Sequence, residues 1–207
     1  VIDDWGHQAR YTYFKNVDFD NAMKHGLFKE GANILSFEDG WVWIANLGKD
    51  VTSVGIVSKH WDKDENHFWK KIKNLPEYKI FGLDKAIVVD HKGEDVPQDN
   101  LYAHPNYRFR SEIMRGRNWA CVGDAAMFLD PLLSQGVTLA MSFGNQLGKL
   151  AYLITEEGVE SIPVLREYEN SYLNELEVLN KIVSQWYQPN FNFDENWKQA
   201  AQKISTV

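Results

Sequence analysis

Residues 118–137 read NWACVGDAAMFLDPLLSQGV and decide how the second half of the chain folds. The apolar run at residues 119–122 is typical of a short buried strand. Gly123 lets the backbone approach a ligand, and Asp124 follows as an acceptor at the carboxyl end of that strand, where ligands bind in open sheets. We therefore expect a ligand site directly after the strand.

A long helix is predicted to follow this loop, over residues 136–156. A turn at residues 130–131 brings residues 134–136 to its start. Helix starts have unpaired N–H groups and the positive end of the helix dipole, which favour negative charge. This one suits an anion, or the N1–C2=O edge of a reduced flavin.

The predicted helix has one narrow face of small residues, formed by Ala140, Gly144 and Gly148. Glycine inside a helix costs about 1 kcal/mol relative to alanine, so two glycines on one face indicate a close neighbour. Two partners fit: another helix, or a nucleotide-binding domain that is absent from this chain.

Upstream, β-branched and aromatic runs alternate with Gly and Asp turns. Strands are predicted over residues 11–14, 33–37, 41–44 and 51–57. The last three are joined by connections short enough to require antiparallel neighbours. Further strands are expected at 87–89 and 107–110, with a turn at His104 and Pro105 between them.

Two more helices are expected. An amphipathic helix over residues 62–74, capped by Asp62 or Asp64, is expected to lie across the sheet. Pro163 suits the first position of a C-terminal helix. The apolar side chains of that helix recur at spacings of three and four, as in a stripe that packs into a core. They are Leu165, Tyr168, Tyr172, Leu176, Leu179, Ile182, Val183 and Trp186.

Together these elements predict an α+β fold. We expect an antiparallel sheet with a covering helix at residues 1–115. A strand, loop and helix should follow at 116–160, and a C-terminal helical segment at 161–207.

Composition excludes several classes of function. The net charge of −7 argues against nucleic-acid binding, which needs clustered Lys and Arg. No apolar run approaches the roughly 18 residues of a membrane span. Cys121 is the single cysteine and is expected to be a small buried side chain in a reducing, cytoplasmic compartment. The His and carboxylate residues at 60–67 have the spacing of a solvated helix start, so no metal site is expected.

Residues 123–125 followed by 130–131 resemble the second FAD-contact motif, Gly-Asp-Ala then Asp-Pro, of the para-hydroxybenzoate-hydroxylase-like flavoproteins. Residues 131–137 resemble the Pro-x-x-Ser-x-Gly-Val form of flavin-dependent halogenases and their monooxygenase-like relatives. The Tyr-Arg-Phe-Arg-Ser run at 107–111 and the tyrosines at 168–172 are similar to the same subgroup.

This resemblance implies that the chain is a portion of an FAD/NAD(P)-binding α/β flavoprotein, with the substrate-domain sheet at residues 1–115 and the FAD-contact strand, loop and helix at 116–160. It also implies FAD as the cofactor, reduced by a separate flavin reductase or by NAD(P)H. Asp124 would contact the ribityl hydroxyls, and Pro131 would lie near the ring. The backbone N–H groups of Gln135 and Gly136 would face the flavin edge, where halogenases hold halide. The implied FAD contacts are Gly123, Asp124, Pro131, Ser134, Gln135, Gly136 and Val137. Asp-Pro is also a common turn starter without any cofactor.

Trp41 and Trp43 match the Trp-x-Trp-x-Ile-Pro signature of halogenases, whereas Ala45 and Asn46 depart from it. With Phe128, the two tryptophans are the residues expected at the substrate pocket. Packing of two tryptophans on one face of a half-buried strand explains the presence of Trp41 and Trp43 equally well. No catalytic side chain is identified.

At Leu133 the tryptophan halogenases carry a Glu that helps to activate indole, so the resemblance implies a substrate other than tryptophan. The expected function is FAD-dependent halogenation or monooxygenation of a small, aromatic molecule through a reduced-flavin/O₂ intermediate. The alternatives are a reductase of the geranylgeranyl-reductase type and a non-catalytic fragment or partner chain.

The 207 residues contain no Gly-x-Gly-x-x-Gly loop, which cradles the FAD pyrophosphate. We therefore expect an amino-terminal FAD-binding region or chain as a partner, together with a small-molecule substrate and a flavin reductase.

Overall fold

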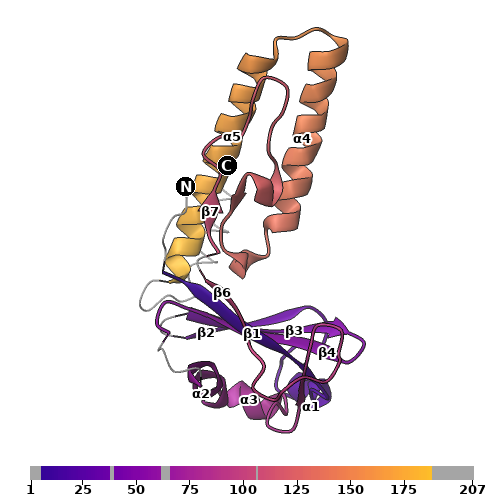
Figure 1. The fold of residues 1–207 in the computed structure, drawn as a ribbon, viewed down its shortest axis with the longest axis vertical. Coiled ribbons are helices and arrows are strands. Elements are labelled where there is room, and N and C mark those ends of the chain that lie inside the picture. The colour runs from indigo at the N-terminus through magenta and orange to yellow at the C-terminus, as the bar shows by residue number, and fades with distance from the viewer. Residues whose placement is uncertain (1–5, 38–39, 62–65, 106, 188–207) are drawn as a thin grey trace. The chain divides into compact units, whose positions relative to one another are not determined.

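The computed structural model describes residues 6–37, 40–61, 66–105 and 107–187. They form two compact units, which divide between Tyr107 and Arg108. One unit is built on a sheet and the other on two long helices (Figure 1). The expected α+β class, with an antiparallel sheet and long helices, is confirmed.

Six antiparallel strands make the sheet of the first unit. Their order is β2-β3-β4-β1-β5, and β6 also pairs with β1. The predicted meander is confirmed, because β2, β3 and β4 are consecutive neighbours. The strands are β1 (Gln8–Lys15), β2 (Ala32–Phe37), β3 (Gly40–Gly48), β4 (Val51–Ser58), β5 (Ile87–Val89) and β6 (Tyr102–Pro105).

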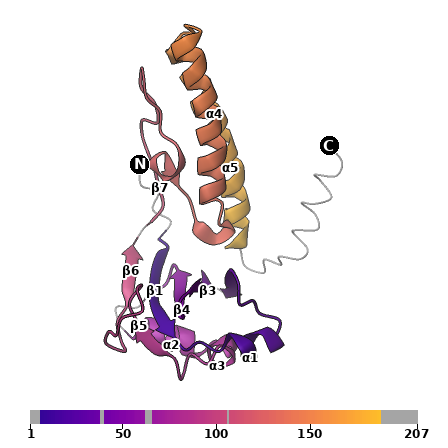
Figure 2. The same cartoon turned by 90° about the vertical axis from the view of Figure 1, so that its right-hand side faces the viewer.

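Three short helices cover one face of this sheet: α1 (Phe19–Lys24), α2 (His67–Lys73) and α3 (Pro76–Ile80). Both views place them on the same side (Figures 1 and 2). The core between the two layers is apolar and fully buried, which is why alternate strand residues are β-branched or aromatic. Its members include Phe14, Val42, Ile44, Val54, Ile56, Phe68, Ile72 and Phe81.

The helix predicted over residues 62–74 is present as α2 from His67 to Lys73, with Asn66 at its N-cap. Residues 62–65, which include both predicted capping aspartates, lie outside the described residues.

The turn predicted at His104 and Pro105 is wrong, because both residues belong to β6 and pair with Ala9 and Gln8 of β1. Pro105 is the last residue of the strand, where its missing N–H interrupts no ladder. The strand predicted over 107–110 is limited to β7 (Phe109–Arg110), which pairs with β8 (Met127–Phe128).

In the second unit, α4 (Gly136–Glu156) and α5 (Ser161–Trp186) lie side by side (Figures 1 and 2). The bounds predicted for α4 are confirmed. α5 begins at Ser161 instead of Pro163, and proline is tolerated there because first-turn N–H groups have no partner within the helix. The predicted stripe is buried at Leu165, Tyr168, Tyr172, Leu176 and Val183, whereas Ile182 is 47% exposed.

The strand predicted at residues 119–122 is reduced to one bridge between Ala120 and Arg115. The Cys121 N–H also donates to the Met114 carbonyl at 2.7 Å, so the segment is one arm of a hairpin. A strand needs a neighbour for its N–H and C=O groups, and the described residues offer only this hairpin. Trp119 is consequently 48% exposed instead of buried.

The small face of α4 is only partly packed by the described residues. The side chain of Ala140 lies against Gly123. At Gly144 and Gly148, in contrast, an added Cβ would meet no described atom within 4 Å. The packing partner predicted for these two glycines is therefore not found in the described part of the chain.

The Gly144→Ala substitution should raise the free energy of unfolding of the 207-residue chain by about 0.5–1 kcal/mol, because it restrains the unfolded helix segment without a clash. Urea unfolding followed by circular dichroism measures this. Gly123→Ala is the contrasting variant: φ is +59° and an added Cβ would lie 3.0 Å from that of Ala140, so stability should fall. A loss of stability in Gly144→Ala would show that this face is already packed.

Candidate functional site

A cavity of about 550 Å³ lies at the N-terminal end of α4. This volume is within the range of roughly 300–1,000 Å³ that is usual for small-molecule sites. The structure brings all seven predicted FAD-contact residues, and Phe128, into its lining. The remaining lining residues are Val122, Met127, Leu129, Asp130, Leu139, Ala140, Tyr172 and Leu176.

Gly123 sets the shape of one wall of this cavity. Its φ of +59° is in the left-handed region that favours glycine, and an added Cβ would lie only 3.0 Å from the Ala140 Cβ. The single 3₁₀ turn Gly123–Ala125 then exposes Asp124. A Cβ at Gly136 would lie 3.9 Å from Asp124 Oδ1, so this carboxylate lies beside the first turn of α4.

The first turn of α4 carries no side-chain cap. Ser134 precedes it in the left-handed conformation, with φ of +51°, which turns the chain into the helix. Gln135 Nε2 donates to the Asp130 carbonyl at 2.8 Å, whereas Gln135 Oε1 is buried and has no hydrogen-bond partner among the described residues. Uncapped first-turn N–H groups can bind an anion or a cofactor oxygen.

Asp130 holds the loop that leads to this helix. Its side chain is buried, its Oδ1 accepts from the Leu132 N–H at 2.9 Å, and its Oδ2 accepts from the Tyr187 hydroxyl at 2.7 Å. The carboxylate thus caps the 3₁₀ turn Pro131–Leu133. Asp130 therefore stabilises the start of the turn through its side-chain hydrogen bond, as Asp commonly does in an Asp-Pro turn, while Pro131 lines the cavity.

Two buried tyrosines of α5 hold the opposite side of the Gly123 loop. The Tyr172 hydroxyl donates to the Gly123 carbonyl at 3.2 Å, and the Tyr168 hydroxyl donates to the Cys121 carbonyl at 3.1 Å. The rings of Tyr172 and Phe143 lie 4.1 Å apart. The sequence placed both tyrosines in the core stripe and in the family resemblance, but not in contact with the loop. A buried phenol requires a hydrogen-bond partner and so signals such a polar contact.

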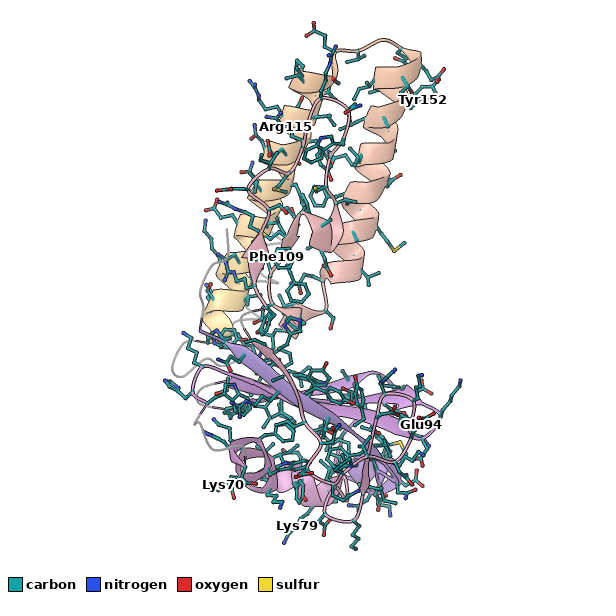
Figure 3. All side chains as sticks on the ribbon, viewed as in Figure 1. Lys70, Lys79, Glu94, Phe109, Arg115 and Tyr152 are labelled. Carbon is teal, nitrogen blue, oxygen red and sulfur yellow. The ribbon has the colours of Figure 1, made fainter. Side chains whose placement is uncertain are left out.

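The segment before the loop, around residues 109–111, hydrogen-bonds to the end of the Gly-Asp-Ala turn. Ser111 Oγ donates to the Ala125 carbonyl at 2.8 Å, and the Ser111 N–H donates to the Ala126 carbonyl at 2.9 Å. Phe109, labelled in Figure 3, stacks on Phe128 with centroids 6.4 Å apart. The Tyr-Arg-Phe-Arg-Ser run therefore supports the Gly-Asp-Ala turn directly.

The residues predicted at the substrate pocket lie in different units. Trp41 and Trp43 are in β3 of the sheet unit, with ring centroids 5.6 Å apart, and Trp41 is only 2% exposed. Phe128 lies in the helical unit. Leu133 ends a 3₁₀ turn, is 36% exposed and does not line the cavity.

Among the described residues, no group of three or more His, Cys, Asp or Glu side chains could hold a metal ion. Within the same part of the chain, no helix is both long and apolar enough to cross a membrane.

Tyr172→Phe should lower the free energy of unfolding by about 0.5–1.5 kcal/mol, because one buried hydrogen bond is lost, although the Gly123 carbonyl keeps its bond from the Ala126 N–H. Tyr152→Phe on α4 is the matched control. Tyr152 is 59% exposed (labelled in Figure 3), so its substitution should change stability by less than about 0.5 kcal/mol. Equal effects of the two substitutions in urea unfolding would contradict the anchoring role of Tyr172.

Burial raises the pKa of Tyr168 to about 12, with contributions from Tyr172 and Cys121. The stability that this tyrosine provides is fully present below about pH 10, where it is protonated in both states. It is lost as the pH rises towards 12, because only the unfolded chain then releases the proton readily. Unfolding of Tyr168→Phe between pH 8 and 11.5 should show a shallower loss of stability than the parent chain, and parallel curves would refute this.

The chain matches the family model described as "Tryptophan halogenase" over residues 24–206. A flavin-dependent halogenase of Armillaria mellea is 29% identical over 153 residues, covering 65% of this chain and 26% of that protein. A 1H-pyrrole-2-carbonyl-[peptidyl-carrier protein] brominase of Pseudoalteromonas luteoviolacea is 27% identical, covering 66% and 32%. The chain thus spans about a third or less of these relatives.

Among solved structures, the myxobacterial chondrochloren halogenase CndH has the same fold. The TM-score is 0.71 at 21% identity, and the match covers 97% of this chain and 48% of that one. The family model covers most of the chain, and the described geometry places the motif residues around one cavity. The chain belongs to the tryptophan halogenase family.

Proposed function

We propose that this chain forms the flavin-facing part of an FAD-dependent halogenase that acts on an aromatic ring of a small molecule. The observation that carries the proposal is the cavity at the start of α4, lined by all seven motif residues and bordered by an uncapped helix end. Membership of a family whose relatives are named flavin-dependent halogenases supports it.

The residues at this cavity fit the edge of a flavin. Gly136 leaves the backbone open to close approach, and the exposed Asp124 carboxylate can accept hydrogen bonds from ribityl hydroxyls. The N–H groups of Gln135 and Gly136 suit a partly negative ring edge or a halide ion. When bound and reduced, by NAD(P)H or a separate flavin reductase, FAD supplies the electrons for the reaction with O₂.

A complete FAD site also needs a pyrophosphate loop, which the 207 residues do not contain. We propose that an amino-terminal region or partner chain of the para-hydroxybenzoate-hydroxylase-like type supplies it. The substrate is proposed to be a phenol or pyrrole and not tryptophan, because Leu133 has no carboxylate with which to activate an indole.

In the full-length protein, Asp124→Ala should weaken FAD binding about 10- to 100-fold, as expected for the loss of one or two hydrogen bonds to a charged group. Quenching of flavin fluorescence measures the dissociation constant. Glu167→Ala is the matched control, since Glu167 is an exposed carboxylate of α5 away from the cavity. An unchanged affinity in Asp124→Ala would remove Asp124 from the proposed site.

The activity itself is tested on the full-length protein with phenol, FAD, a flavin reductase and its NAD(P)H, O₂ and bromide. Bromophenol should form only when bromide and O₂ are both present. Formation of a hydroxylated product without bromination would contradict the proposed halogenase activity and support a monooxygenase activity. Turnover that continues without O₂ would favour the reductase alternative, and no turnover by a folded, FAD-loaded protein would favour the non-catalytic one.

A further inference from the structure

The end of α5 contacts the loop that leads into α4. The hydroxyl of Tyr187, the residue directly after α5, donates to Asp130 Oδ2 at 2.7 Å. A hydroxyl–carboxylate hydrogen bond of this length is among the stronger kinds in proteins. Of the described residues, Asp130 lines the cavity but is only 3% exposed, and Tyr187 does not line it. Tyr187 therefore reaches the cavity wall without belonging to it.

Asp130 also contacts the residues that lead into α4. Its Oδ1 accepts from the Leu132 N–H at 2.9 Å, and its carbonyl accepts from Gln135 Nε2 at 2.8 Å. Gln135 is the N-cap residue of α4, and its N–H and that of Gly136 are the groups proposed to face the flavin edge. Hydrogen bonds through Asp130 thus connect the end of α5 to the start of α4.

The backbone between Asp130 and α4 needs support from outside. Ser134 has φ of +51°, a left-handed conformation that is uncommon for a residue with a side chain. A conformation of this kind persists where the surrounding contacts fix it. Asp130 supplies such contacts on both sides of Ser134, to Leu132 before it and to Gln135 after it. The orientation of the first turn of α4 therefore depends on where Asp130 is held.

α5 gives Tyr187 a defined position from which to hold Asp130. Four side chains along the helix bind residues of the segment 108–123 by hydrogen bonds or an ion pair. They are Tyr168, Glu169, Tyr172 and Asn180, which contact Cys121, Arg115, Gly123 and Arg108 in that order. Val183, one turn before Tyr187, is also buried. The end of α5 cannot shift without disturbing these contacts, so the Tyr187 hydroxyl is a fixed point for the loop.

We propose that Tyr187 is a positioning residue, which acts through Asp130 to orient the Gln135 and Gly136 N–H groups towards a flavin edge or a halide ion. The inference rests on the proposed function and adds to it a residue from outside the halogenase motif. Tyr187 acts without touching the cofactor: its hydroxyl holds the Asp130 side chain, and Asp130 holds the turn. N–H groups that are aligned before the ligand arrives bind it at little reorganisation cost.

The test uses the full-length protein labelled with ¹⁵N-glycine, without FAD or substrate. The probe is the Gly136 amide signal in ¹H–¹⁵N NMR spectra, assigned with Gly136→Ala and followed during titration with sodium bromide, with sodium gluconate keeping the ionic strength constant. Tyr187→Phe removes only the hydroxyl. We expect it to move the Gly136 signal and to weaken bromide binding about three- to tenfold, the effect of losing one supporting hydrogen bond.

Two further variants separate positioning from a general loss of stability. Tyr152→Phe removes an exposed hydroxyl from α4 itself and should leave the Gly136 signal and the bromide affinity as in the parent. Asp130→Ser keeps a residue that can cap the turn, but its side chain is too short to reach Tyr187. In the Asp130→Ser background, Tyr187→Phe should change the bromide affinity by less than about twofold, because the two residues act as one unit.

The signals of Gly144 and Gly148, further along α4, report whether each variant is folded. They should stay in place in Tyr187→Phe. Three results would overturn the inference: an unchanged Gly136 signal and bromide affinity in Tyr187→Phe, equal displacement of all three glycine signals, or a full effect of Tyr187→Phe in the Asp130→Ser background.

Failure of this inference is distinguishable from failure of the proposed function. Bromination of phenol by the parent protein, together with a Gly136 signal that ignores Tyr187→Phe, would retain the halogenase and reject the positioning role. A Gly136 signal that moves in Tyr187→Phe but does not respond to bromide in the parent would support the positioning role and contradict halide binding at this helix start.

Discussion

The hydrogen bonds between the α5 tyrosines and the 121–123 backbone are the interactions on which the helical unit depends. They join a loop that is paired only in a short hairpin among the described residues to a long helix that packs into the core. Once Tyr172 holds the Gly123 carbonyl, the left-handed turn, the exposed Asp124 and the cavity follow in sequence. A loop held in this way can present backbone groups to a ligand without rearranging first.

Glycine has a comparable effect in the two units, for different reasons. Gly123 provides a left-handed backbone and close contact with α4, which shapes the cavity. Gly55 has an ordinary strand conformation, and its value lies in the space it leaves for the Trp43 ring. In both units, therefore, the surface offered to a ligand depends on a missing side chain.

Polar and aromatic chemistry are divided between the units. The helical unit offers a carboxylate, an uncapped helix end and exposed backbone, which suit a cofactor with hydroxyl and carbonyl groups. The sheet unit offers stacked and tilted aromatic rings, which suit an apolar planar molecule. The proposed FAD-dependent halogenase would use both kinds of surface.

The sequence by itself determined the elements whose signals are local. The meander follows from strand periodicity and short connections, α4 from its helical spacing, and the seven cavity residues from one continuous motif. Tertiary structure alone decided where distant segments meet: β6 including Pro105, the tyrosine hydroxyls on the Gly123 loop, and the Tyr11–Tyr102 stack. Residues 119–122 have the composition of a buried strand, yet pairing requires a neighbour that local sequence does not specify, so only a hairpin forms there.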